Sequence, residues 1–161
     1  MKDVEKVKEY NIERIPAIAV VGKRDYGIRY YGIPSGYEFS SLVNVIIIVS
    51  KGVTSILDDT RTKLKTVNKP IHIKIFVTPT CPHCPRMVSL AYQFTVESEL
   101  IKTDVIEASE YPEFVQKYSI VATPKIVINE TVEIVGATPE EYFVDQVIRA
   151  QYPPPTQTMY T

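Results

Sequence analysis

Hydrophobic and polar residues alternate most clearly in residues 71–77, where three isoleucines at odd-numbered positions are separated by His72 and Lys74. This period of two predicts a β-strand. Residues 38–49 have helix length and are mostly apolar, and they predict a helix despite many β-branched side chains. The same reasoning predicts further strands at residues 15–21, 28–31, 101–108, 125–129 and 132–135. It predicts helices at residues 1–10, 55–67, 111–118 and 139–150, and another that follows the loop after residue 77 and ends at about residue 99. Thr138 is the predicted N-cap of the helix at 139–150. This mixture predicts an α/β protein.

An internal repeat relates the two ends of the chain. The sequence YNIERIP at residues 10–16 matches YSIVATP at 118–124, with an offset of 108 residues. At an offset of 104, Gly32 then matches Gly136 and Phe39 matches Phe143. The order helix, proline, strand, strand, glycine, helix therefore occurs twice. A strand, a Cys-x-x-Cys motif, a helix and a strand come before the second copy only.

The composition changes this picture little. The chain has 161 residues, 45% of them hydrophobic and 23% charged, which is typical of a globular protein. Its formal net charge of −1 gives no basic field, so we expect no nucleic-acid partner. The longest apolar run, residues 42–49, is far shorter than the roughly 20 residues that cross a bilayer, so we expect no membrane span. The charged first ten residues show no secretory signal, so we expect a cytoplasmic protein.

The chain has two cysteines, Cys81 and Cys84, which lie between a predicted strand and a predicted helix. Two intervening residues allow the sulfurs to meet across the first helical turn. A thiol at the start of a helix lies near unpaired backbone N–H groups, which stabilise the thiolate and lower its pKa. Cys81 is then the attacking thiol and Cys84 the resolving thiol. Pro82 suits the first position of the helix, because its φ is already helical.

The octapeptide TPTCPHCP at residues 78–85 resembles the active-site loop of the thioredoxin superfamily. More narrowly, it resembles the two-unit, glutaredoxin-like protein disulfide oxidoreductases of thermophilic archaea and bacteria. The resemblance extends to residues 122–124, which match the cis-proline loop of that family. It implies that Pro124 is cis, that the backbone of Thr123 binds a substrate peptide, and that the chain exchanges disulfides with protein or small-molecule substrates. It also implies a thioredoxin-reductase-like electron donor, a role in cell redox homeostasis, and no cofactor beyond the cysteine pair.

The resemblance divides the chain into four parts. Residues 69–152 form one complete thioredoxin-like unit, and residues 1–52 form the C-terminal half of another. Residues 53–68 are a linker helix and residues 153–161 a disordered tail. A half-unit has too few strands to bury both of its faces. We therefore expect residues 1–52 to pack on the second unit, to pack on another copy in a homo-oligomer, or to be poorly ordered. The half that would carry a first Cys-x-x-Cys motif is missing before Met1, and three explanations stay open: a start codon placed downstream of the true one, a deliberate truncation, or a genuine half-unit.

Two features near the cysteines bear on the reaction. Thioredoxins proper place an aspartate six residues before the first cysteine, whereas this chain has Ile75 there. A proton acceptor must therefore come from elsewhere, and Lys74 and Lys125 are candidates only because they are close in sequence. His83 is expected to tune the active site by stabilising the thiolate, which would make the couple more oxidising. An exposed histidine without such an effect is the alternative.

Two other interpretations of the motif stay open. The cysteines could belong to a zinc or iron–sulfur site, but zinc usually takes four ligands and the chain offers two cysteines and two histidines, so a second chain would be needed. We therefore expect no metal. The chain could also be a non-catalytic thioredoxin-like module for peptide binding or assembly. An activity assay on a variant lacking Cys81 discriminates that module from an enzyme.

Overall fold

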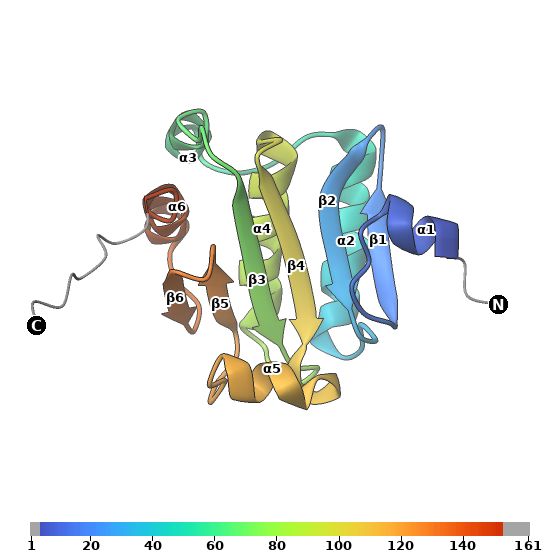
Figure 1. Cartoon of the computed structure of the whole chain (residues 1–161). Helices are drawn as coiled ribbons and strands as arrows, with labels where there is room; N and C mark the ends of the chain where they lie inside the picture. The colour runs from blue at the N-terminus through green and yellow to red at the C-terminus, as the bar shows by residue number, and fades with distance from the viewer. Residues whose placement is uncertain (1–3, 153–161) are drawn as a thin grey trace, which may run out of the picture.

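The computed structural model describes residues 4–152, in which strands and helices are interspersed along the chain (Figure 1). The strands are β1 (Ala17–Val21), β2 (Asp25–Tyr31), β3 (Ile71–Val77), β4 (Ile101–Glu107), β5 (Lys125–Ile128) and β6 (Val132–Val135). The helices are α1 (Val4–Glu9), α2 (Tyr37–Lys51), α3 (Asp58–Leu64), α4 (Cys84–Glu97), α5 (Pro112–Lys117) and α6 (Glu140–Arg149), with a short 3-10 helix at Ala108–Glu110. The α/β class predicted from the sequence is confirmed.

The six strands form one continuous sheet in the order β1-β2-β4-β3-β5-β6. Strand β2 lies parallel to β4, with Tyr30 opposite Val105, and this pairing joins residues 17–31 to the strands of the second unit. Strand β3 runs parallel to β4 and antiparallel to β5. Of the three arrangements expected for the N-terminal half, the structure has the first: it packs on the C-terminal unit and extends its sheet.

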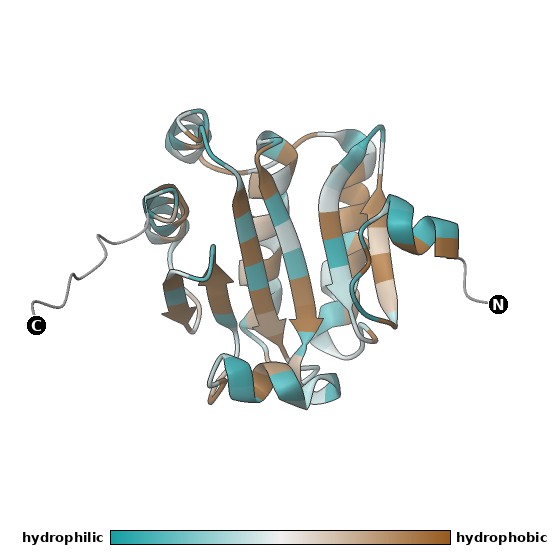
Figure 2. Ribbon diagram, in the orientation of Figure 1, coloured by the Kyte–Doolittle hydropathy of each residue, from teal (hydrophilic) through white to brown (hydrophobic). Residues whose placement is uncertain are grey.

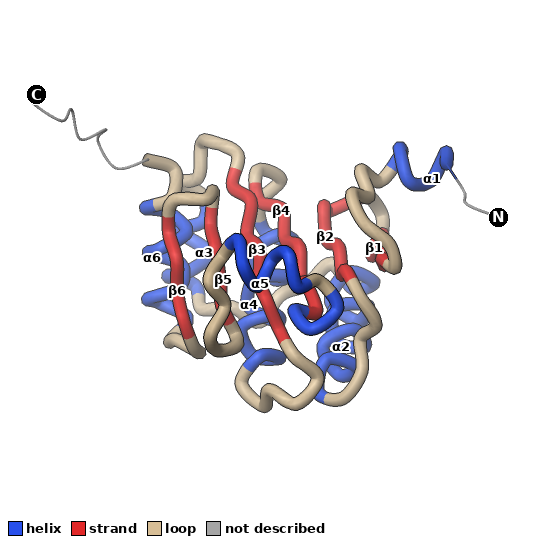
Figure 3. The backbone as a smooth tube through the Cα atoms, turned by 60° about the horizontal axis from the view of Figure 1, so that its bottom comes forward, coloured by secondary structure: helices blue, strands red, loops and turns tan. Residues whose placement is uncertain are grey.

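Two hydrophobic layers lie on opposite faces of the sheet. One layer contains Ile28, Tyr30 and Ile75 together with side chains of α2 and α4, which lie behind the sheet in Figure 1. The other contains Tyr31 and Phe76, which α5 and the segment before it cover. Figure 2 shows the alternating colours along β3 and β4, and Figure 3 shows α5 in front of the strands. Successive side chains on a strand point to opposite sides of the sheet, so the side chains of residues 71–77 lie alternately on two covered faces.

The internal repeat is present in the backbone as well as in the sequence. The peptide bonds before Pro16 and Pro124 are both cis. The amide of Gly32 donates a hydrogen bond to the carbonyl of Pro16 (2.9 Å), and the amide of Gly136 donates one to the carbonyl of Pro124 (2.8 Å). Asn11 and its repeat partner at position 119 both have a left-handed backbone, with φ of 49° and 48°. The two segments therefore adopt the same conformation from the helix end through the proline to the glycine.

Two local predictions at helix starts were wrong. Thr138 is not an N-cap: α6 begins at Glu140 with Pro139 in the capping position, and the hydroxyl of Thr138 is buried without a hydrogen-bond partner. Helix α4 begins at Cys84, so Pro82 precedes the helix instead of occupying its first position. The tail predicted for residues 153–161 lies outside the described residues. In the described part of the chain, residues 4–152, no helix has both the length and the apolar character needed to cross a membrane.

Candidate active site

The two cysteines lie at the junction between β3 and α4. They form a disulfide, with their Cα atoms 5.5 Å apart. The amide of Cys81 donates a hydrogen bond to the carbonyl of Thr78 (3.2 Å), which closes a turn directly after the strand. The strand fixes one end of the loop and the helix fixes the other. This placement between strand and helix is the one that the sequence predicted for a reactive cysteine pair.

The two sulfurs have different surroundings. Cys81 retains 7% of its surface exposed, whereas Cys84 is completely buried. The backbone amide of Cys84 donates a hydrogen bond to Sγ of Cys81 (3.1 Å). An amide that points at a sulfur from the first turn of a helix stabilises a thiolate there, as does the helix dipole. Cys81 is therefore the sulfur best placed to attack an outside disulfide, and Cys84 is placed to attack Cys81.

The two residues between the cysteines are exposed to solvent. Pro82 belongs to the turn before α4, and His83 is the N-cap residue of that helix. The His83 side chain makes no capping hydrogen bond. The residue is therefore exposed to solvent in the turn between the two cysteines. This position is compatible with the tuning role predicted for His83.

The cis-proline loop meets the end of β3. The hydroxyls of Thr78 and Thr123 share a hydrogen bond of 3.1 Å, which ties the residue before Pro124 to the residue after β3. A hollow of about 310 Å³ lies beside this bond. The side chain of Val121 at its edge is 90% exposed. The residues that line the hollow are Thr78, Ala108, Ser109, Val115, Ile120, Val121, Ala122 and Thr123.

The two lysines that the sequence offered as proton acceptors lie on the other face of the sheet. Lys74 and Lys125 share that face with Phe76, whereas Cys84 packs with Ile75 on the opposite face. Lys74 bonds to the hydroxyl of Tyr118 (3.0 Å), and Lys125 pairs with a glutamate of β6 at 2.8 Å. Because the sheet separates them from the buried thiol, neither lysine suits that role.

Glu38, in the first turn of α2, is a buried carboxylate that the sequence analysis did not single out. It is completely buried, and neither of its carboxylate oxygens has a hydrogen-bond partner. No other carboxylate among residues 4–152 has both oxygens in that state. Burial raises the pKa of Glu38 to about 7. A carboxyl group with this pKa can take up or release a proton near neutral pH.

Two observations place the start of α2, which carries Glu38, beside the cysteine loop. The amide of the preceding residue, Tyr37, donates a hydrogen bond to the carbonyl of Pro79 (3.0 Å), two residues before Cys81. The hydroxyl of Tyr30 is also buried without a hydrogen-bond partner. Its pKa is raised mainly by burial and, to a smaller extent, by the charge of Glu38. Tyr30, Val105 and Ile75 form one row across three neighbouring strands, so Tyr30 lies about 10 Å from Ile75. The sequence signal was the single acidic residue of a largely apolar helix.

No group of three or more histidine, cysteine, aspartate or glutamate side chains that could hold a metal ion occurs among the described residues 4–152. His72, the second histidine of the chain, pairs through Nε2 with Asp104 (2.6 Å). It alternates with Ile71 and Ile73 on β3 and so lies on the face opposite the cysteines. The structure therefore does not bring the two histidines and two cysteines together.

Comparison with known proteins gives the family context of this site. A family profile described as a thioredoxin domain matches residues 71–149. A thioredoxin of Methanocaldococcus jannaschii is 33% identical over 78 residues, which are 48% of this chain and 92% of that protein. The F subunit of the alkyl hydroperoxide reductase of Staphylococcus epidermidis is 30% identical over 128 residues, which are 76% of this chain.

Among solved structures, a protein disulfide oxidoreductase from Aeropyrum pernix K1 matches with a TM-score of 0.85 and 34% identity. That match covers 94% of this chain and 67% of the other. It therefore includes the N-terminal half as well as the cysteine-bearing unit. The chain spans 24% of the length of its relatives described as NADH dehydrogenase and as the F subunit of alkyl hydroperoxide reductase.

Proposed function

Because the chain belongs to the thioredoxin family and holds Cys81 and Cys84 in a disulfide, we propose that it is a protein disulfide oxidoreductase. The family and the cysteine pair support thiol–disulfide redox chemistry in general. The proposal adds the substrates, disulfide-bearing proteins or small molecules, and the residues that act on them. It also adds an electron donor, a thioredoxin-reductase-like flavoenzyme, which the family resemblance implies and which would supply the reducing equivalents.

In the reducing direction the reaction has two displacements. The thiolate of Cys81 attacks one sulfur of the substrate disulfide, forms a mixed disulfide and releases the other substrate sulfur as a thiolate. The thiolate of Cys84 then attacks Sγ of Cys81, closes the internal disulfide and releases the second substrate sulfur. Two electrons pass from the dithiol to the substrate, and two protons leave the enzyme thiols. No cofactor beyond the cysteine pair takes part in these steps.

Glu38 is the proposed acceptor of the proton that the buried Cys84 thiol must lose. A buried thiol resists ionisation, so its attack is faster when a nearby base removes the proton. Glu38 comes from the N-terminal half, next to the loop that carries the cysteines. In this interpretation the two halves share one active site, and the half without cysteines contributes the base.

The substrate chain is proposed to lie along the cis-proline loop. The backbone of Thr123 would bind the chain next to its reacting cysteine, and the hollow beside Val121 would hold one of its side chains. The exposed valine and the neighbouring hydroxyls suit an uncharged side chain. Pro82 and His83 would border the attacked disulfide, since both are exposed beside Cys81.

The single observation that carries the proposal is the contrast between the two sulfurs. Cys81 is the partly exposed one and accepts a hydrogen bond from the amide of Cys84, while the second sulfur is completely buried. A purely structural disulfide needs no such division between an attackable and a protected sulfur. The division matches the attacking and resolving roles of a catalytic pair.

Reduction of insulin disulfides, followed with the full chain and dithiothreitol as the electron source, tests the proposal. We expect the rate of insulin reduction with Cys81→Ser to fall to the rate measured with dithiothreitol alone. In a separate reaction without dithiothreitol, reduced Cys84→Ser should accumulate a mixed disulfide between Cys81 and a substrate thiol, visible as an added mass that later addition of dithiothreitol removes. Full activity in Cys81→Ser would contradict the proposal and favour a non-catalytic peptide-binding or assembly module. The cytoplasmic location and the homo-oligomer through residues 1–52 remain predictions.

A further inference from the structure

The outer edge of β1 has a different environment from its counterpart in the second unit. The repeat matches β1 with β5 and β2 with β6, since the two cis prolines precede β1 and β5. Strand β5 pairs with β6 on one side and with the antiparallel β3 on the other. Within the described residues, β1 pairs with β2 only. The second unit therefore shows what lies beside such a strand: another strand, antiparallel to it.

The helix that follows the repeated strands shows the same difference. In α6, Phe143 and Val147 are completely buried, and the ring of Phe143 packs on that of Phe94 in α4, with centroids 5.1 Å apart. Their repeat counterparts in α2, Phe39 and Val43, are 61% and 42% exposed. Helix α4 follows β3 in the chain. The second unit thus covers the edge strand with β3 and the helix with α4, on one face of the sheet.

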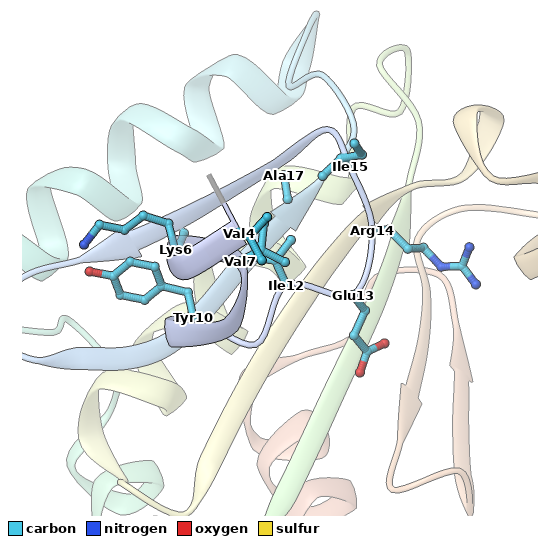
Figure 4. A pocket seen from close by; sticks show the side chains of 10 residues that line it. Val4, Lys6, Val7, Tyr10, Ile12, Glu13, Arg14, Ile15 and Ala17 are labelled. Carbon is cyan, nitrogen blue, oxygen red and sulfur yellow. The ribbon is translucent and has the colours of Figure 1, made fainter. Parts of the chain in front are cut away.

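The corresponding surface of the first half is apolar and open on both faces of β1. On one face a groove of about 640 Å³ runs between β1 and α2, lined by Ile18, Leu42 and Ile46 among others. On the other face a groove of about 490 Å³ lies between α1 and β1. Figure 4 shows Val4, Val7, Ile12 and Ala17 gathered in this second groove.

We propose that a second copy of this chain covers this surface. A twofold axis perpendicular to the sheet relates the two copies. The β1 strand of one copy then pairs antiparallel with the β1 strand of the other, and their two α2 helices lie side by side. The repeat calls for an antiparallel strand, and such an axis supplies one. The same axis keeps the second α2 on the face of the first, where its exposed apolar side chains can pack against their equivalents. Two six-stranded sheets then become one.

The sequence of β1 suits pairing with itself. Its five residues, Ala-Ile-Ala-Val-Val, carry no charge and no proline, the two features with which edge strands usually prevent pairing. Antiparallel pairing centred on Ala19 places Ala17 opposite Val21 and Ile18 opposite Val20, so every cross-strand pair is apolar. The formal net charge of −1 gives two copies little mutual repulsion.

Sedimentation equilibrium of the full chain, from micromolar to millimolar concentration, tests the proposal. We expect the mass to rise to twice 18.3 kDa with concentration. Val43→Glu on α2 and Val21→Lys on β1 should each keep the mass at 18.3 kDa while the far-ultraviolet circular dichroism stays unchanged. The matched control is Val135→Lys, at an exposed valine of the opposite edge strand β6, which should still form the dimer.

Hydrogen exchange gives a second readout that does not depend on the variants. In the dimer the outward amides of residues 17–21 should exchange more slowly as concentration rises. A monomer at every concentration, or a dimer that persists in both Val21→Lys and Val43→Glu, would overturn the proposal. The proposal would also be overturned if the amides of β1 became protected from hydrogen exchange only after a different polypeptide was added. The outcome is independent of the redox proposal, because neither valine belongs to the cysteine site.

Discussion

Gly36 and Pro79 bring the two halves of the chain into direct backbone proximity at the active-site loop. A Cβ atom on Gly36 would lie well inside 3.0 Å of the carbonyl oxygen of Pro79, closer than a real Cβ can approach. Gly36 also has a φ of 58°, in the left-handed region that favours glycine. The next residue, Tyr37, donates its amide to the same carbonyl. The start of α2 therefore positions the loop that carries Cys81.

Gly36→Ala is expected to slow disulfide exchange as well as lower stability. The added methyl group must displace the backbone of Pro79, which moves the loop two residues before Cys81. We expect a rate loss of about tenfold or more, since small misplacements of reacting groups cost about this much or more. Insulin reduction and the unfolding midpoint in urea measure the two effects.

Gly52→Ala is the matched control for that experiment. Gly52 ends α2 with a φ of 64°, almost the same as that of Gly36, but no atom lies within 4 Å of its Cβ position. Alanine there should lower the free energy of unfolding by roughly 1 kcal/mol, through backbone strain alone. Its exchange rate should remain that of the wild type. Equal rate losses in the two variants would show that the contact with Pro79 has no special role.

Glu38→Gln should change how stability depends on pH. The pKa of Glu38 is raised from 4.5 to about 7 by burial, so the folded state holds a proton that the unfolded state has lost between these values. The free energy of unfolding therefore falls as pH rises through this window, by about 3 kcal/mol from this group. Urea unfolding at pH 4.5, 6 and 8 should show this slope in the wild type and not in the variant.

The same variant tests the proposed role in proton transfer. With Glu38 as acceptor, the rate of the Cys84 step should rise with pH through an apparent pKa near 7, and Glu38→Gln should remove this rise and slow the step by about 10²-fold. Glu99→Gln, at an exposed glutamate, is the control and should keep the wild-type profile. A variant with the wild-type pH–rate profile would leave Glu38 as a buried structural residue only.

His83→Gly should make the reduction potential of the cysteine pair more negative. An imidazole beside Cys81 favours the thiolate and hence the reduced form, and glycine removes that contribution. We expect a shift of about −30 mV or more, which corresponds to a tenfold change in the equilibrium constant. Equilibration with glutathione buffers measures the potential. An unchanged potential would show that the exposed ring tunes nothing.

Thr78 and Thr123 should be energetically coupled. Their hydroxyls share a hydrogen bond that ties the cis-proline loop to the end of β3. In a double-mutant cycle with Thr78→Val and Thr123→Val, we expect a coupling energy of about 0.5–1.5 kcal/mol in urea unfolding. Additive effects of the two substitutions would indicate that the loop is held by its other contacts.

The sequence predicted the parts of this protein that depend on local pattern. The strand at residues 71–77 follows from alternation, and the cysteine loop lies where that strand meets a helix. The repeat between residues 10–16 and 118–124 predicted two matching segments, and the cis bond at Pro124 followed from the resemblance. Each signal lies within a few consecutive residues, so no knowledge of distant contacts was needed.

The tertiary structure decided what depends on contacts between distant residues. The N-cap of α6 was predicted at Thr138 because threonine is a common capping residue. In the fold its hydroxyl is buried without a hydrogen-bond partner and does not cap the helix. Lys74 and Lys125 are near the cysteines in sequence, yet the sheet separates them from Cys84. Glu38 is 43 residues before Cys81, and only the packing of α2 beside α4 brings it to the loop. Its burial, which raises its pKa, is a property of the assembled sheet and helices and not of the residues around it in sequence.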